Sequence, residues 1–122
     1  MELDERAPLV AQRSNRIDAV DRKTARVVDR GFAYGGHTFS ASLAAQVKWA
    51  GAYVAREALT YPLQLPDIDN ALVELPDAAA VAGAYGALVQ HVQAVLASGA
   101  VLKQRLKDAA SEGELNAIVD DR

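Results

Sequence analysis

Apolar residues recur at alternating spacings of four and three along residues 76–110, and this pattern predicts the longest helix of the chain. The spacing runs unbroken from Val81 to Ala109, which makes four heptads of the coiled-coil kind. Ala82, Val89 and Leu96 widen the apolar stripe until about residue 98. We therefore expect the first half of this helix inside a packed domain and the second half in a narrower helix pair.

Residues 5–30 form a second, far more polar helical segment. Its apolar positions are spaced so that most of them share one seam, although Arg13 interrupts it. Because so polar a helix is marginal in water by itself, we expect it to pack on copies of itself or on another protein. The alternative is a surface helix that lies on its own domain. The candidate interface residues of this arm are Val10, Ile17, Val20 and Val27.

The helix predicted from Ser40 or Ser42 to about Leu59 is apolar on two sides. One stripe holds Leu43, Val47, Ala50, Val54 and Ala58, and the opposite side holds Trp49 and Tyr53. We expect one side to meet the long helix and the other to meet a hairpin, the arm or a partner chain. Trp49 and Tyr53 are thus either core residues or further interface anchors.

Glycine and turn residues mark the remaining elements. Gly35-Gly36 between β-prone residues predicts a tight hairpin over residues 31–39, and Gly31 suits a helix C-cap. Residues 63–75 predict a second hairpin around an Asp/Asn turn, with its register open. A capping box at Ser111–Glu114 opens a short last helix, after which residues 120–122 should be frayed.

Together these elements predict a mainly α fold with minor β (α+β). Their order is a long N-terminal helix, a β-hairpin, a helix, a second β-hairpin, a long helix and a short C-terminal helix. Charge density drops near residue 31: residues 1–30 hold seven Lys/Arg and six Asp/Glu, and residues 31–122 hold six and ten. We accordingly divide the chain into a helical arm, residues 1–30, and a small domain, residues 31–122.

Composition excludes several classes of protein. The 51% hydrophobic content argues against a disordered chain, and the absence of cysteine excludes disulfides and thiolate chemistry. The polar, acidic start is unlike a signal peptide, and polar residues interrupt the longest apolar stretches, so we expect no membrane span. The net charge of −3 argues against general nucleic-acid binding. We expect the alternating charges of the arm to form a solvated face: Arg13, Arg16, Arg22, Lys23 and Arg26.

No motif in the sequence indicates a reaction. His37 and His91 lack a second ligand at helical spacing, so we expect structural histidines and no metal. Asp67 and Asp69 resemble half of a calcium loop but lack its later ligands, which favours plain turn chemistry. P-loop, dinucleotide and nucleophile-elbow motifs are absent, and His37 near Ser40 or Ser42 is only sequence proximity. We expect no catalytic residue, no cofactor and no enzyme.

Two stretches resemble a small domain of unknown function encoded by tailed bacteriophages, often beside tail-fibre and tail-tip genes. The opening stretch runs from Gly31 to Ser40 as GFAYGGHTFS and continues with Ala45–Trp49 as AQVKW. The closing stretch combines Leu102-Lys103, Asp108–Ala110 and Glu114–Ile118. The likeness covers about residues 17–122, although Pro76 stands where a Ser or Thr cap is common. It implies a virion or assembly component and supplies no catalytic residues.

From the arm, the two-sided helix and this resemblance we expect a non-enzymatic virion structural protein at the tail tip or tail fibre. It would be made in the host bacterial cytoplasm and mediate attachment between proteins. Its expected partners are further copies of itself, in a homo-oligomer for which a trimer is one option, and other tail proteins of the virion. We expect no nucleic-acid partner and no membrane. The alternatives are a tail-fibre assembly chaperone or adaptor, and a capsid or neck decoration protein.

Overall fold

The computed structural model describes the backbone of residues 6–122 and the side chains of residues 8–122. The predicted α+β class and the order of the elements are confirmed. The predicted helix start at Glu5 lies outside the described residues. The elements are α1 (Arg6–Asp29), β1 (Phe32–Tyr34), β2 (His37–Phe39), α2 (Leu43–Val54), β3 (Leu63–Pro66), β4 (Leu72–Leu75), α3 (Ala78–Asp108) and α4 (Glu112–Ala117).

The chain folds as two compact units. Residues 28–94 form one of them, here called the hairpin unit, and residues 6–27 together with residues 95–122 form the other, here called the helical unit. The long helix α3 supplies its first part to the hairpin unit and its last part to the helical unit.

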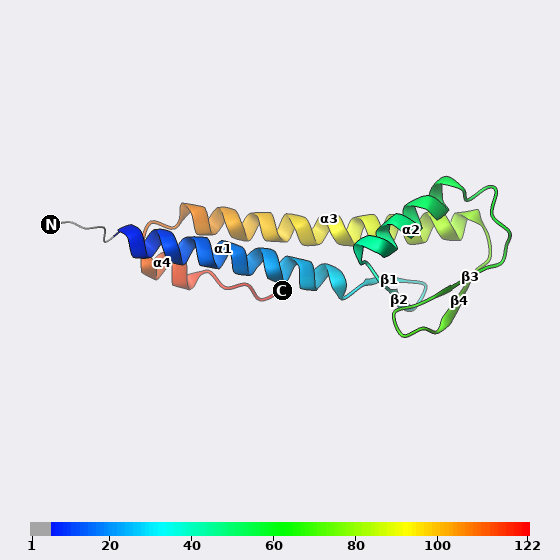
Figure 1. The fold of residues 1–122 in the computed structure, drawn as a ribbon, viewed down its shortest axis with the longest axis horizontal. Coiled ribbons are helices and arrows are strands. Elements are labelled where there is room, and N and C mark those ends of the chain that lie inside the picture. Colours follow the sequence, from blue (N-terminus) through cyan, green and yellow to red (C-terminus); the bar gives the residue numbers. More distant parts are fainter. Residues whose placement is uncertain (1–5) are drawn as a thin grey trace. The chain divides into compact units, whose positions relative to one another are not determined.

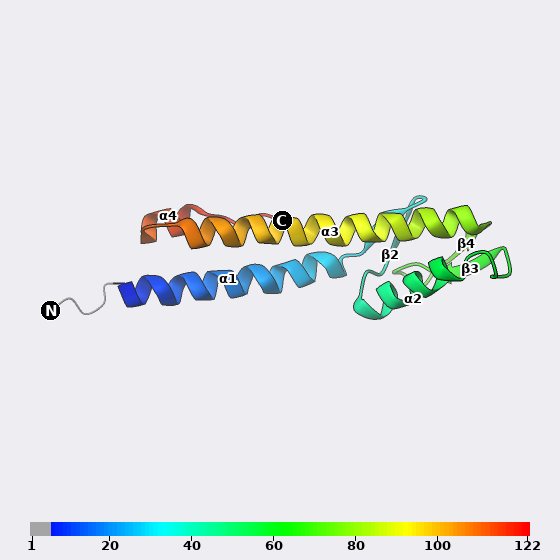
Figure 2. The same ribbon diagram turned by 90° about the horizontal axis from the view of Figure 1, so that it is seen from above.

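The helical unit consists of α1, the last part of α3, and α4, which lie side by side (Figures 1 and 2). Its core contains Val20 of α1, Leu102 and Leu106 of α3, and Leu115 of α4, all of them buried. The predicted helix pair along the second half of α3 is therefore confirmed. Helix α1 packs its apolar residues against α3 and α4 of the same chain. This agrees with the alternative that the arm is a helix lying on its own domain.

The core of the hairpin unit is aromatic. The rings of Phe32 and Phe39 stack at 5.6 Å, and Trp49 meets them edge-on at 5.9 and 5.5 Å. Val81 and Leu88 of α3 are buried in the same cluster. Because Phe32 and Phe39 are paired directly across the first hairpin, that hairpin presents both rings to α2 and α3.

Both hairpins are antiparallel and two-stranded. In the first, Gly35 and Gly36 adopt φ angles of 59° and 80°, which explains why two glycines occupy the turn. In the second, Leu63 pairs with Leu75 and Leu65 with Val73, which fixes the register that the sequence left open. The leucine at the end of β4 is buried in the aromatic core.

Helix α2 is shorter than predicted. Ser42 caps its start, since its Oγ accepts a hydrogen bond from the Ala45 N–H at 3.1 Å. The expected end near Leu59 was wrong, because the helix ends at Val54 and continues as turns. The Tyr61 hydroxyl donates to the Arg56 carbonyl at 2.6 Å, so a carbonyl that would continue the helix is bonded to a side chain instead.

Helix α3 is also long and apolar enough, by length and composition alone, to cross a membrane. This finding differs from the expectation from sequence, because glutamines interrupt this apolar stretch but no Asp, Glu, Lys or Arg occurs between Asp77 and Lys103. The core helix of a globular protein meets the same criterion, and α3 carries core residues of both units. The absence of a membrane partner stays a prediction.

Candidate functional site

The first candidate surface is one side of α2. Leu43, Val47 and Val54 are 76%, 66% and 81% exposed, whereas Trp49 on the other side is 6% exposed. The structure thus directs the aromatic side of α2 into the core and leaves the aliphatic stripe largely open. We call Leu43, Val47, Ala50 and Val54 the α2 face.

A groove of about 320 Å³ borders the α2 face. Leu43, Val47 and Ala50 line it from α2, and Tyr85 and Val89 are among the residues that line it from α3. The other lining side chains are apolar or amide groups, so no formal charge faces the groove. Such a surface offers shape and apolar area to a partner.

The second candidate is a more polar hollow on the other side of α2, and it measures about 450 Å³. Trp49 and Leu65 contribute apolar surface to it, while Lys48, Asp67 and Asn70 contribute polar groups. Its lining comes from the end of β2 and the residues after it, from α2, and from the turn between β3 and β4. We call it the Trp49 pocket.

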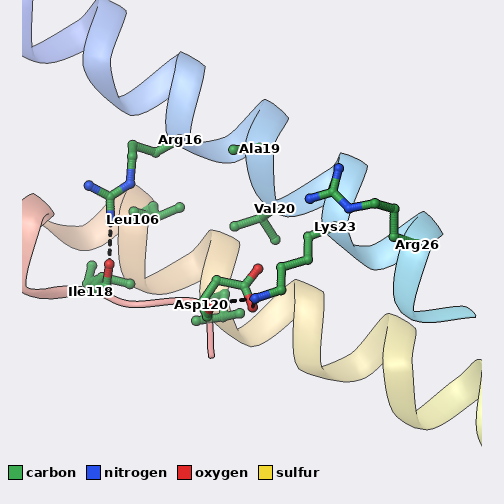
Figure 3. Close-up of a pocket in the computed structure, with 9 residues that line it drawn as sticks. Arg16, Ala19, Val20, Lys23, Arg26, Leu106, Ile118 and Asp120 are labelled. Atoms are coloured by element: carbon green, nitrogen blue, oxygen red, sulfur yellow. Dashed lines mark hydrogen bonds and ion pairs between the residues drawn. The ribbon is translucent and has the colours of Figure 1, made fainter. Parts of the chain in front are cut away.

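The third candidate is a small basic groove of about 190 Å³ in the helical unit (Figure 3). Arg16, Lys23 and Arg26 of α1 line it together with Asp120. Two of these cations already bind the C-terminal segment: Arg16 donates to the Ile118 carbonyl, and Lys23 Nζ donates to the Asp120 carbonyl at 2.7 Å. The side chains of the groove therefore mainly hold the segment that follows α4 in place, and we call this set of contacts the clasp.

The segment after α4 is also held by its own ion pair, so the prediction of a frayed end was wrong. Arg122 Nε and Nη2 donate to the two carboxylate oxygens of Asp120 at 2.8 and 2.7 Å. Arg122 Nη1 reaches Thr24 Oγ1 at 2.8 Å and Ser98 Oγ at 3.2 Å. The hydrogen bonds from Arg122 outweigh the effect of burial and lower the Asp120 pKa to about 2.

Arg13 has a defined role that the sequence did not reveal. Its Nε and Nη2 donate to the carbonyls of Leu106 and Ala109, at 3.0 and 2.7 Å. A guanidinium at this place satisfies carbonyls at the end of α3 and suits the negative end of the helix dipole. With Arg13, Arg16 and Lys23 all bonded to backbone oxygens, the expected fully solvated face is wrong for these three residues. Arg22 and Arg26 are exposed.

The histidines and turn acids form no reactive constellation. His91 Nε2 lies 3.1 Å from the Val28 carbonyl, and His37 Nδ1 lies 3.4 Å from Asp67 Oδ2. Asp67 Oδ1 accepts the N–H groups of Asp69 and Ala71, as expected of turn chemistry. Among the described residues no group of three or more His, Asp or Glu is arranged to hold a metal ion.

A family model described as a domain of unknown function, DUF4376, matches residues 11–121. The chain belongs to this family. It covers both units of the fold, from the second turn of α1 to the clasp around Asp120. Comparisons with curated proteins and with solved structures gave no match.

The candidate interface residues lie in different surroundings within this DUF4376 domain. Val20 and Trp49 are buried in the cores of the two units, and Ile17 packs partly buried against the helical core. Tyr53 stacks on Tyr85 at 4.9 Å, with the Arg56 guanidinium over its ring. Val10 is 57% exposed and Val27 is half-buried.

The α2 face escaped the sequence analysis as a site because both sides of α2 are apolar. The covered side is the one that meets the cluster formed by the two hairpin phenylalanines, Leu75 of β4, and Val81 and Leu88 of α3. The one available signal was that Leu43, Val47 and Val54 are aliphatic while the opposite side carries the Trp and Tyr rings, which the sequence treated as the candidate anchors.

Proposed function

We propose that this DUF4376 domain is a non-enzymatic attachment protein of a tailed-bacteriophage virion, in the tail-tip or tail-fibre region, and that it acts as a homo-oligomer. The α2 face carries the proposal, because three large aliphatic side chains there are at least 66% exposed. Clustered apolar surface of this kind is typical of protein–protein contacts. The virion setting is supported by the likeness of the GFAYGGHTFS stretch to a phage-encoded domain.

We propose that the α2 face binds a second copy of this chain. The stripe carries no charge, so two copies meet there without like-charge repulsion. Its pattern also matches itself in reverse. In an antiparallel pair related by a two-fold axis, Leu43 of one copy faces Val54 of the other, and Val47 faces Ala50. Large side chains would thus enter the apolar groove beside α2.

The test is the mass of the protein in solution, measured by sedimentation velocity on the full chain. We expect the wild-type chain to self-associate and Val47→Glu to shift it towards the monomer, because a carboxylate would then be buried in an apolar contact. Val119→Glu is the matched control, since Val119 is a similarly exposed valine of the helical unit. A wild-type chain that stays monomeric at millimolar concentration would refute the homo-oligomer. Equal association of wild type and Val47→Glu would refute the α2 face as its site.

The virion setting has a separate test. Mass spectrometry of purified particles of the encoding phage would detect the protein in the finished virion if it is a structural part. Its presence only in the infected cell would favour the assembly chaperone instead. An encoding genome with no phage genes around it would overturn the virion proposal and leave the self-association result untouched.

A further inference from the structure

The Trp49 pocket has the dimensions and lining of a small-molecule site. Its volume of about 450 Å³ falls within the range of roughly 300–1,000 Å³ typical of such sites. Ala45, Trp49 and Ala52 line it from α2, and Leu65 and Ile68 line it from the second hairpin. The two alanines matter because larger side chains at these positions would fill the space beside Trp49.

Hydrogen bonds fix the wall of the pocket that comes from the second hairpin. Asp67 Oδ1 accepts the N–H groups of Asp69 and Ala71 at 2.8 and 2.9 Å, which closes the turn. The Ile68 N–H donates to the Thr38 carbonyl at 2.8 Å, which ties this turn to the first hairpin. The pocket is therefore formed before any ligand arrives, and binding would require little ordering of the chain.

The two charged side chains of the pocket, Asp67 and Lys48, differ in whether they already have hydrogen-bond partners. Asp67 faces the His37 ring and accepts two backbone N–H groups, so its carboxylate is already satisfied. Burial acts to raise the Asp67 pKa, but these hydrogen bonds outweigh it and lower the pKa. Lys48 is exposed and makes no ion pair or hydrogen bond with any residue of the described part of the chain. The pocket thus presents one cation, Lys48, that is not itself paired with a carboxylate, beside one carboxylate whose oxygens already accept hydrogen bonds.

We propose that the Trp49 pocket binds a small amphiphilic carboxylate, with its hydrocarbon part against Trp49 and Leu65 and its carboxylate on Lys48. Trp49 and Leu65 supply the apolar surface against which an alkyl or aryl group would be buried. Lys48 supplies the positive charge that attracts the carboxylate. An uncharged ligand would leave that cation unused. The satisfied state of Asp67 reduces its repulsion of an incoming carboxylate. This site is independent of the α2 face, which lies on the other side of the same helix.

Octanoate is a suitable probe, with 1-octanol as its uncharged match. Trp49 is the only tryptophan of the chain, so its fluorescence reports on this pocket directly. We expect octanoate to change the emission of Trp49 along a saturable curve and to bind several-fold more tightly than octanol. Salt should weaken the binding of octanoate but not of octanol, since it screens the contact with Lys48.

Variants locate the binding. Lys48→Gln should weaken octanoate about fivefold, the value of a partly exposed ion pair of about 1 kcal/mol, and leave octanol unchanged. Lys107→Gln, an exposed lysine of the helical unit, is the matched control and should change neither. Ala52→Leu should abolish both by filling the space, with circular dichroism confirming that the variant is folded.

Two results would overturn the proposal. One is the absence of a saturable change in Trp49 emission at millimolar octanoate. The other is equal binding of octanoate by wild type and Lys48→Gln. Val47→Glu separates this proposal from the proposed function, because it should disrupt self-association and leave octanoate binding intact.

Discussion

Replacing Asp120 with Asn removes the anion around which the C-terminal segment is organised. In the wild type, Arg122 donates two hydrogen bonds to this carboxylate, and Lys23 Nζ lies 3.7 Å from its Oδ1. The side chains of Asp120 and Arg122 are only 17% and 10% exposed, so water screens the pair weakly. The native pKa of about 2 lies nearly two units below the ordinary value of 3.8. At 1.36 kcal/mol per unit, the ionised form stabilises the fold by about 2 kcal/mol.

The sign of the pH dependence follows from the direction of this shift. A carboxyl whose pKa is lower in the folded state binds fewer protons there than in the unfolded state. Its contribution is complete above about pH 5, where the carboxyl is ionised in both states. It is lost as the pH falls from about 5 to below 2 and Asp120 becomes protonated in the native protein.

Urea denaturation of wild type and Asp120→Asn at a series of pH values measures this contribution. We expect Asp120→Asn to have a free energy of unfolding about 2 kcal/mol lower at pH 6, with the difference closing towards pH 2. Asp121→Asn, at the exposed neighbouring position, is the control and should follow the wild type. A difference between wild type and Asp120→Asn that is the same at pH 6 and pH 2 would refute the assignment to ionisation.

Three further substitutions test the packing by thermal or urea denaturation. Leu88→Ala should lower stability by about 2–4 kcal/mol, because Leu88 is 2% exposed, whereas Leu96→Ala on the same helix, at 54% exposure, should cost less than about 1. Gly99→Ala should destabilise by about 1–3 kcal/mol, since a Cβ there would lie 2.6 Å from a threonine hydroxyl of α1; Gly86→Ala, with open space, should be neutral or stabilising. Ser42→Ala should lower the free energy of unfolding by about 1 kcal/mol, because it removes the α2 cap. A loss of stability no larger than that of Ser→Ala at an exposed serine would contradict the capping role.

The elements that sequence predicted correctly are those set by local chemistry. The turn of the first hairpin requires positive φ angles, which Gly35 and Gly36 adopt easily. The spacing of apolar residues from Val81 to Ala109 indicates a helix whatever the rest of the chain does. The capping box at Ser111 also formed, with the Glu114 N–H donating to Ser111 Oγ at 3.1 Å. Each of these depends on residues only a few positions apart.

The features that escaped prediction depend on partners far along the chain. Arg13 binds carbonyls more than 90 residues away, and Arg122 bonds to Thr24 across a similar distance. In the sequence, both arginines look like ordinary surface charges. The choice of the covered side of α2 has the same origin, because both sides of that helix are apolar and the core that covers one of them is built from the first hairpin, β4 and α3.

The sharing of α3 between the two units has a consequence for folding. Starting a helix is costly, but each residue added to an existing helix costs little. Once either unit has formed its part of Ala78–Asp108, the same helix can grow into the other part without a second nucleation step. Hydrogen exchange along α3 would then show the amides of the two parts gaining protection together, and the folding of the two cores would be coupled through this shared helix.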